Sequence, residues 1–531
     1  MKKMKKILAM LLALTMVLGM GLTAMAEDKK PEKIDTATAT IEGIKEDPAT
    51  IKLYQLVDAE YNEKGLTGYS LDNNLTTADL ADFYNPTYTE IMNISKKNLV
   101  EYSQLEDATP NAITWTKEKT SNEPAIYSYS TSLEAGMYLV KIIGSGDVVY
   151  NPMIISIGYD AKKAGNSNTL TPGSVDATSG WELQDAVVAV KSSQISLTKE
   201  GTDSTPETAG NTDDTNVKVG DAVNYTVTTT IPSYSAQYTK VTFDVTDKLV
   251  NGLTYANAEG INTTPVVKVN NVALTANTDY TLTFANDGKS FTISFNEAYV
   301  KSLAGKTEAE REVVITYEAY LTADAITKYA ENKVELNYTH KPDDHTGKKE
   351  ATEVVNTVEI DGVIKKEDDN KKALPEAKFG LFTSYDANTN SVTGQVGELY
   401  KTQSDGDIYF GGLDADAVYY LKEIEAPKGY SLNDTVYKIE FTDLDVDETT
   451  GKLTSYKVKV TYVEDGRENV VTSGAIEYGA ELANSIVQIK NTKINALPST
   501  GGIGTTIFTV AGCGIMIAAA YFFFASRKKE N

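Results

Sequence analysis

The sequence predicts an all-β protein built as an elongated row of β-sandwich domains. Apolar and polar residues alternate with a period of two in many short segments, as in Val223–Val227, Ile315–Leu321 and Val458–Tyr462. Glycine, asparagine and aspartate separate such segments at intervals of about ten residues, which is typical of antiparallel sandwiches. The chain also holds 32 tyrosines, which favour strands. Within the predicted domains, a short helix is expected near residues 77–83 or 307–312.

The first 26 residues have the features of a secretory signal peptide. Four lysines precede an apolar run over Ile7–Leu22, and the small residues Ala24 and Ala26 follow it. A positive region, an apolar core and a small-x-small site stand in the order that export requires. The apolar run is short for a membrane anchor. We therefore expect signal cleavage after Ala26 and an exported chain that begins at Glu27.

The exported chain is long enough to form about three domains. We place them at 27–191, 192–356 and 357–495. In the first domain, strands are expected at Ile51–Leu56, Gly136–Val140 and Val148–Ile155. The linkers between the three predicted domains are short, so a stiff rod is expected rather than beads on a string.

Composition excludes several function classes. The net charge is −24, which argues against binding nucleic acid. The single cysteine, Cys513, lies beyond the third domain, so the predicted domains hold neither a disulfide nor a Cys/His metal site. The sequence also has no recognisable catalytic triad, P-loop or dinucleotide-binding glycine loop. No cofactor or metal is expected and the chain is not predicted to be an enzyme, although an oxygen-ligated metal stays open.

The C-terminus, residues 497–531, combines a short motif with an apolar stretch and a basic tail. The stretch over Ile503–Ala525 is long enough to cross a bilayer as a helix, and the tail after it should stay cytoplasmic. The motif before it consists of Leu497, Pro498, Ser499, Thr500 and Gly501. This arrangement resembles the LPXTG sorting signal of Gram-positive wall proteins. The resemblance implies that a membrane sortase cuts between Thr500 and Gly501 and holds the Thr500 carbonyl as a thioester until an amine attacks it.

Two lysines are predicted to face a domain core, which is costly for a charged side chain. Lys199 shares the parity of Ile195 and Leu197, and Lys366 shares that of Ile364. Alternate residues of a strand point to the same face, so both lysines should point inward. We expect them on the first strands of the second and third domains. Lys365 is the weaker alternative to Lys366, because its parity points outward.

One asparagine and one acid join each lysine. By the same parity, Asn332 points inward with Val334 and Leu336, and Asn491 with Val487 and Ile489. Both asparagines are expected on the last strand of their domain. The acids are Asp247 in the second domain, with Asp244 as the alternative, and Glu423 in the third. We find no equally clear set in the first domain.

These sets resemble the intramolecular isopeptide sites of pilin and adhesin domains. The third domain, with its Tyr419–Tyr430 segment around Glu423, resembles the immunoglobulin-like collagen-adhesin B-type repeat, and the first resembles the N-terminal domain of Gram-positive backbone pilins. Burial lowers a lysine pKa and raises a carboxyl pKa, so a neutral amine and a neutral acid can coexist. The resemblance implies Lys199–Asn332 and Lys366–Asn491 bonds, promoted by the acids.

A backbone pilin also needs an amine to attack the sortase thioester. The family places it at the junction of its first two domains, in a pattern of tryptophan followed by Tyr-Pro-Lys-Asn. Here Trp181 precedes Ala189–Ser192, which puts Lys191 in the matching place although its neighbours differ. Lys162 and Lys163 are the next candidates.

The resemblance favours a cell wall-anchored shaft subunit of a pilus with a role in adhesion. Its expected partners are sortase, further copies of the same chain, minor pilins, peptidoglycan, and host or bacterial surface receptors. A non-polymerising wall-anchored adhesin or a minor (base) pilin is the second hypothesis. A surface enzyme is the third, and it has little support because no catalytic group is visible beyond the self-cross-linking sites.

Overall fold

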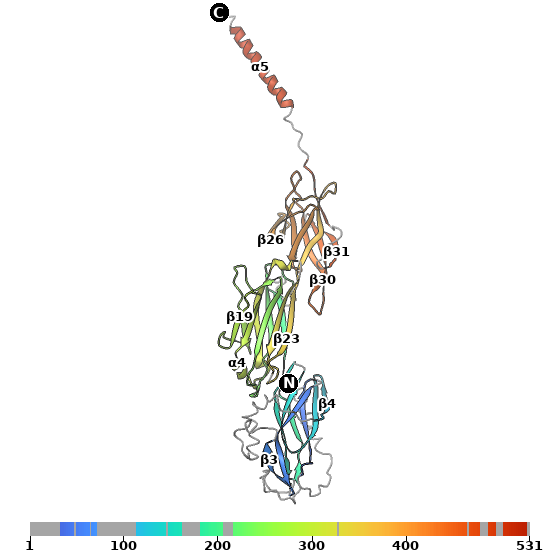
Figure 1. The fold of residues 1–531 in the computed structure, drawn as a ribbon. Coiled ribbons are helices and arrows are strands. Elements are labelled where there is room, and N and C mark those ends of the chain that lie inside the picture. The colour runs from blue at the N-terminus through green and yellow to red at the C-terminus, as the bar shows by residue number, and fades with distance from the viewer. Residues whose placement is uncertain are drawn as a thin grey trace.

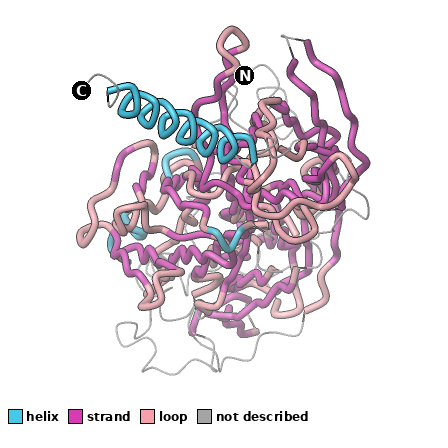
Figure 2. The backbone as a smooth tube through the Cα atoms, turned by 90° about the horizontal axis from the view of Figure 1, so that it is seen from above, coloured by secondary structure: helices cyan, strands magenta, loops and turns pink. Residues whose placement is uncertain are grey.

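The structure is a computed structural model that describes residues 32–46, 49–63, 65–71, 113–144, 147–161, 181–204, 216–326, 329–342, 344–464, 467–477, 487–494 and 503–527. Strands make up most of these residues. They form three β-sandwiches in a row, followed by one long helix (Figure 1), and Figure 2 shows how strands predominate over helices. The predicted all-β class and elongated arrangement are confirmed. The helix expected near 77–83 and the whole signal peptide lie outside the described residues.

The N-terminal sandwich packs two four-stranded sheets around buried residues such as Ile41, Leu53 and Val140. One sheet has the order β11 (Ala186–Ala189), β1 (Ala37–Ile44), β5 (Ala125–Leu133), β4 (Thr116–Asn122). The other runs β3 (Gly65–Leu71), β2 (Thr50–Asn62), β6 (Gly136–Ile143), β8 (Met153–Ile157), and β9 (Tyr159–Ala161) pairs with β10 (Trp181–Leu183). The strand expected over 148–155 is split into β7 (Val148–Tyr150) and β8, because Pro152 has no N–H for the ladder.

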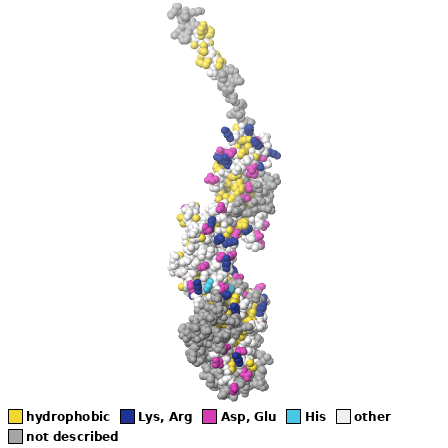
Figure 3. Space-filling model, viewed as in Figure 1, with side chains coloured by type: hydrophobic (Ala, Val, Ile, Leu, Met, Phe, Trp, Pro, Cys, Tyr) yellow, Lys and Arg dark blue, Asp and Glu magenta, His cyan; other side chains and the backbone are white. Residues whose placement is uncertain are grey.

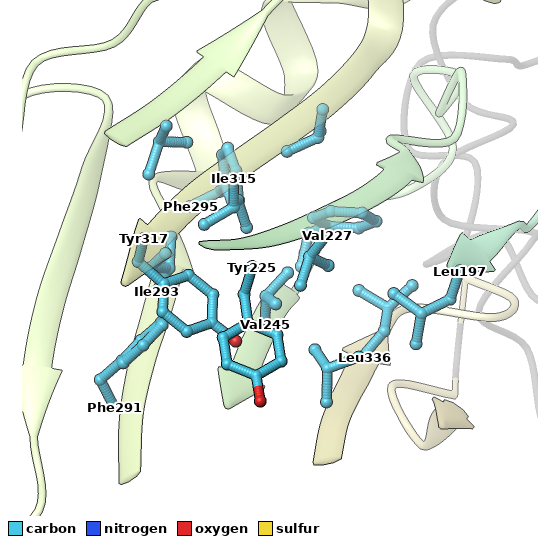
Figure 4. Packing of buried hydrophobic residues seen from close by; sticks show 14 of the residues in the cluster. Leu197, Tyr225, Val227, Val245, Phe291, Ile293, Phe295, Ile315, Tyr317 and Leu336 are labelled. Atoms are coloured by element: carbon cyan, nitrogen blue, oxygen red, sulfur yellow. The ribbon is translucent and has the colours of Figure 1, made fainter. Parts of the chain in front are cut away.

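Among the described residues, the middle sandwich has the largest core, in which aromatic and β-branched side chains interdigitate (Figure 4). Its first sheet has the order β13 (Leu197–Asp203), β14 (Ala222–Thr230), β21 (Glu312–Leu321), β17 (Val266–Val269), β18 (Val272–Ala273), with β16 (Leu253–Thr254) on β21. Its second sheet has the order β19 (Tyr280–Phe284), β20 (Ser290–Phe295), β15 (Phe243–Asn251), β22 (Ala330–Tyr338), β23 (Gly347–Val355). Short helices are α4 (Glu297–Ser302), η1 (Ala309–Arg311) and η2 (Ala323–Ala325). Of these, η1 lies in the predicted 307–312 segment, and α4 was not predicted.

The C-terminal sandwich faces a three-stranded sheet against a six-stranded one. The small sheet has the order β27 (Asp407–Leu413), β24 (Val358–Asp368), β32 (Val487–Asn491). The large sheet has the order β26 (Ser391–Lys401), β25 (Lys378–Asp386), β28 (Tyr419–Glu425), β29 (Val436–Val446), β30 (Leu453–Glu464), β31 (Arg467–Glu477). Strand β32 joins β24 in parallel, so the last strand of this sandwich lies beside its first.

Backbone and side-chain hydrogen bonds link neighbouring sandwiches. At the first joint, β12 (Ser192–Gln194) pairs with β7 of the N-terminal sandwich, and the Tyr238 hydroxyl donates to the Tyr150 carbonyl at 2.9 Å. At the second joint, Val219 N–H donates to the Gly412 carbonyl at 2.8 Å. Asn356 binds the backbone of Gly451 and Leu453 there, at 2.9 and 3.0 Å. These bonds explain why the sandwiches follow one another as a rod.

The C-terminal apolar stretch forms the helix α5 (Ile503–Arg527). Among the helices of the described ranges, none has both the length and the apolar character needed to cross a membrane. The membrane span therefore stays a prediction from the sequence. On the face drawn in Figure 3, basic and acidic side chains of the described residues are interspersed rather than gathered by sign.

Candidate functional site: two buried lysine–acid–asparagine clusters

The middle cluster lies between the two sheets of its sandwich. Lys199 comes from β13 in one sheet, and Asp247 and Asn332 come from the neighbouring strands β15 and β22 of the other. All three are inward members of alternating strands, and the side chains of Lys199 and Asp247 are 0% and 1% exposed. The prediction that Asn332 lies on the last strand of its domain is wrong, because β23 follows β22 and pairs with it at the sheet edge.

Tyrosine hydroxyls connect the three groups of the middle cluster. Lys199 Nζ forms an ion pair with Asp247 Oδ2. The Tyr317 hydroxyl lies 2.5 Å from Lys199 Nζ and donates to Asp247 Oδ2, also at 2.5 Å. Asn332 Nδ2 donates to the same hydroxyl at 3.0 Å. Tyr255 donates to the other oxygen of Asp247, Oδ1, at 2.7 Å, so the carboxylate is fully engaged.

Burial favours the uncharged forms of the lysine and of Tyr317 in the middle cluster. Burial lowers the pKa of the Lys199 amine, and the attraction of Asp247 opposes this change. Burial likewise raises the pKa of Tyr317, so its hydroxyl keeps its proton. The rings of Tyr225 and Tyr317 stack at 5.5 Å beside the amine, and Figure 4 shows them grouped with Phe291 in the core. A neutral amine in such a site is a nucleophile.

The structure distinguishes the two aspartates that the sequence left open. Asp244 has the opposite parity to Asp247, is partly exposed and pairs across the sheet with Ser294. Asp247 is the one in contact with Lys199. The tyrosines were not predicted as site residues, although Tyr225 and Tyr317 share the inward parity of their apolar strands, and that parity was the available signal.

The second cluster, in the C-terminal sandwich, has a different architecture. Lys366 on β24 and Asn491 on β32 belong to neighbouring parallel strands of one sheet, and Glu423 reaches them from β28 of the facing sheet. Asn491 lies on the last strand of the sandwich, as expected. Lys366, Glu423 and Asn491 are all at most 1% exposed. Lys365 points to the other face, where its amine lies 3.7 Å from Asp407.

The carboxylate of Glu423 contacts both Lys366 and Asn491 directly. Lys366 Nζ lies 2.5 Å from Asn491 Oδ1 and 3.4 Å from Glu423 Oε2. Asn491 Nδ2 donates to Glu423 Oε1 at 2.8 Å, and the Asn433 N–H donates to Oε2 at 2.8 Å. Burial against groups such as the Phe379 ring lowers the pKa of Lys366 to about 8, although Glu423 opposes the change. The amine therefore lies beside an amide carbonyl and gives up its proton more readily than an ordinary lysine.

Lys191 is exposed and lies at the first joint, between β11 and β12. Its backbone carbonyl accepts a hydrogen bond from the Asn151 N–H at 2.9 Å. Its side chain makes no hydrogen bond or ion pair with the part of the chain that the structure describes. The alternatives Lys162 and Lys163, the signal residues Ala24 and Ala26, and the sorting motif at 497–501 lie outside the described residues.

Four protein-family descriptions match successive parts of the chain. They are a T6 antigen Ig-like domain at 34–192, a Gram-positive pilin backbone subunit 2 Cna-B-like domain at 219–342, a SpaA prealbumin-like fold domain at 361–473, and an LPXTG cell wall anchor motif at 489–531. Together they match regions in all three sandwiches and the C-terminal helix.

Individual proteins are similar to the chain over most of its length. The chain is 26% identical to the trypsin-resistant surface T6 protein of Streptococcus pyogenes serotype M6, over 98% of this chain and 99% of that protein. The solved T6 backbone pilin of serotype M6 S. pyogenes has a TM-score of 0.56 and 20% identity, covering 88% of this chain and 100% of that one. The full-length major pilin SpaD of Corynebacterium diphtheriae has a TM-score of 0.47 and 17% identity, covering 87% and 98%.

Proposed function

From the premise that the chain is a Gram-positive backbone pilin with an LPXTG cell wall anchor, we propose that sortase joins Thr500 of one subunit to Lys191 of the next and that two internal isopeptide bonds stabilise each subunit. The succession of pilin domains and anchor along one chain carries the assignment as a shaft subunit. The two buried lysine–acid–asparagine clusters support the internal bonds.

The internal bonds form without an added enzyme. In the C-terminal sandwich the Lys366 amine attacks Cγ of Asn491, whose carbonyl oxygen is already 2.5 Å away. The new C–N bond replaces the bond to Nδ2, which leaves as ammonia after taking one proton from the amine. Glu423 touches both nitrogens and carries that proton. Folding supplies the proximity that an enzyme would otherwise supply.

The two bonds would reinforce each sandwich along its length. The Lys199–Asn332 bond encloses 134 residues and the Lys366–Asn491 bond encloses 126. By the loop-entropy estimate used for disulfides, each is worth about 5 kcal/mol against unfolding. The first would join two facing sheets and the second two neighbouring strands. Both would carry tension past most of the sandwich, which suits a fibre under shear.

Polymerisation requires an accessible amine close to a rigid surface. Lys191 is exposed, and β11, β12 and the bond to Asn151 hold its backbone at the first joint. Attack by its amine on the Thr500 thioester gives a head-to-tail contact that does not close, and therefore a fibre. Minor pilins and peptidoglycan would be the other acceptors, and an adhesive role at host or bacterial surfaces would follow from surface display.

A ladder assay tests polymerisation. In a Gram-positive host with a pilus sortase, the chain should give an SDS-resistant ladder at multiples of the subunit mass, and Lys191→Ala should abolish it. Lys240→Ala, which removes another exposed lysine from the middle sandwich, is the matched control and should leave the ladder intact. A ladder that survives Lys191→Ala would exclude Lys191. A single wall-linked band in wild type would favour the alternative, a non-polymerising adhesin or base pilin.

Intact mass tests the internal bonds. Each bond lowers the mass of the folded chain by one ammonia relative to its sequence. A chain with the full sequence mass would contradict both bonds, whatever the ladder shows.

A further inference from the structure

The two clusters differ in how the acid reaches the asparagine. In the C-terminal sandwich, Glu423 contacts both Lys366 and Asn491 through its two oxygens. In the middle sandwich, no hydrogen bond among the described residues joins Asp247 to Asn332. Aspartate is one methylene shorter than glutamate, and both its oxygens are engaged by Lys199, Tyr317 and Tyr255. The acid of the middle cluster alone therefore has no path for a proton to the leaving nitrogen.

The Tyr317 hydroxyl occupies the gap between acid and asparagine. It lies 2.5 Å from Lys199 Nζ and 2.5 Å from Asp247 Oδ2, and it accepts a hydrogen bond from Asn332 Nδ2 at 3.0 Å. One oxygen thus touches the nucleophile, the acid and the leaving group. The C-terminal cluster has a phenylalanine ring, Phe379, beside its lysine and no hydroxyl among its described contacts.

We propose that Tyr317 is a catalytic residue of the middle cross-link, which relays the proton between Lys199, Asp247 and the amide nitrogen of Asn332. This inference rests on the proposed Lys199–Asn332 bond. A tyrosine and an aspartate together do here what one glutamate does in the C-terminal sandwich.

The relay balances in protons and bonds. The Lys199 amine gives its extra proton to Asp247 and attacks Cγ of Asn332 as a neutral nucleophile. As the C–Nδ2 bond breaks, Tyr317 donates its proton to Nδ2, and the new secondary amide returns one proton to the Tyr317 oxygen directly or through Asp247. Overall two protons leave Nζ: one reaches Nδ2 as the C–N bond breaks, and Asp247 passes the other to the released ammonia, which departs as ammonium. Tyr317 ends protonated and Asp247 ends ionised, as they began. No oxidant or further reactant is needed.

The surroundings of Tyr317 suit this role. Burial raises the pKa of Tyr317, so the hydroxyl stays protonated until the leaving nitrogen of Asn332 takes its proton. Stacking on Tyr225 and edge contact with Phe291, at 5.1 Å between centroids, hold its ring in one orientation. Phenylalanine at this position would keep these ring contacts and remove only the oxygen.

Full-length chain made by cell-free translation, quenched at intervals and digested for mass spectrometry, tests the relay bond by bond. We expect wild type to show both cross-linked peptides, and Tyr317→Phe to form the Lys366–Asn491 bond at the wild-type rate but the Lys199–Asn332 bond at least tenfold more slowly. The matched control is Tyr234→Phe, which removes another buried hydroxyl of the same core, one that donates to the Thr339 carbonyl at 2.9 Å. It should form both bonds at the wild-type rate.

The outcomes separate the relay from the bond itself. A Tyr317→Phe chain that forms the middle bond as fast as wild type overturns the relay and leaves the proposed function standing. A wild-type chain that never forms the middle bond removes that part of the proposed function and the relay with it. If Tyr317→Phe does not fold, judged by circular dichroism, 3-fluorotyrosine at position 317 replaces it. This residue keeps the ring and the hydroxyl, but the hydroxyl is more acidic. The relay therefore requires a changed rate of Lys199–Asn332 bond formation, and an unchanged rate refutes it.

Discussion

Replacing Glu423 by glutamine should uncouple the fold of the C-terminal sandwich from its cross-link. Glutamine keeps the size of the side chain but cannot take a proton from the Lys366 amine, which lies 3.4 Å from Glu423 Oε2. We expect the variant to fold with Lys366 and Asn491 in place and with no bond between them. Its intact mass should show that it has lost one ammonia fewer than the wild-type chain.

The size of the effect follows from the loop that the bond closes. A loop of 126 residues corresponds to about 5 kcal/mol of lost unfolded-state entropy. For a domain of this length, 1 kcal/mol moves the melting temperature by about 3–5 °C, so the C-terminal sandwich should melt about 15–25 °C lower. The estimate is a lower bound, because the variant also leaves a buried amine without its carboxylate partner.

Differential scanning calorimetry and intact mass spectrometry together measure this prediction. The control is Glu425→Gln on the same strand, where a 62% exposed carboxylate pairs with Lys378 at 2.7 Å. Exposed pairs contribute about 0–1 kcal/mol, so this control should lose the same ammonia as wild type and melt within a few degrees of it. If Glu423→Gln lost the full ammonia, or kept the wild-type melting temperature without the bond, the reasoning about the acid or the loop would be wrong.

Two further predictions concern titration and the second joint. In the unlinked variant Asn491→Ala, the folded-state pKa of Lys366, about 8, lies below its ordinary value of 10.5, so the unfolded chain binds more protons than the folded chain between these two pH values. The stability of the C-terminal sandwich should therefore rise as pH increases from about 8 to 10.5. Urea unfolding across this range should show that rise, and the double variant Asn491→Ala/Lys366→Met should lack it. At the second joint, Asn356→Ala removes hydrogen bonds to the backbone of Gly451 and Leu453 and leaves the buried Leu453 N–H without a partner, which costs about 1–3 kcal/mol. Small-angle scattering should detect bending between the sandwiches, whereas an unchanged maximum dimension would show that these bonds do not hold the joint.

Much of the candidate site could be predicted because strand alternation is local. The inward direction of Lys199, Lys366, Asn332 and Asn491 follows from the parity of their apolar neighbours, and each of them is buried. The choice between Asp247 and Asp244 was left open by the sequence, and only the contact of Asp247 with Lys199 decides it. The all-β class and the row of sandwiches likewise followed from period-two patterns and turn residues, and both are confirmed.

Partners across the core could not be predicted, because they depend on strand order and on the facing sheet. The sequence assigned Asn332 to a last strand, but β23 continues the sheet beyond it. Nor did it indicate that Lys199 and Asn332 face each other from two sheets while Lys366 and Asn491 are neighbours in one. Tyr317 is inward by parity like many core tyrosines, and only the packing of β21 against β15 and β22 brings its hydroxyl to the lysine, the acid and the amide together.

The sequence by itself therefore determined which side chains are buried, since that depends on the backbone period and on neighbours a few residues away. The tertiary structure alone decided which buried side chains meet, since contacts between residues more than a hundred positions apart arise only when sheets pair and pack.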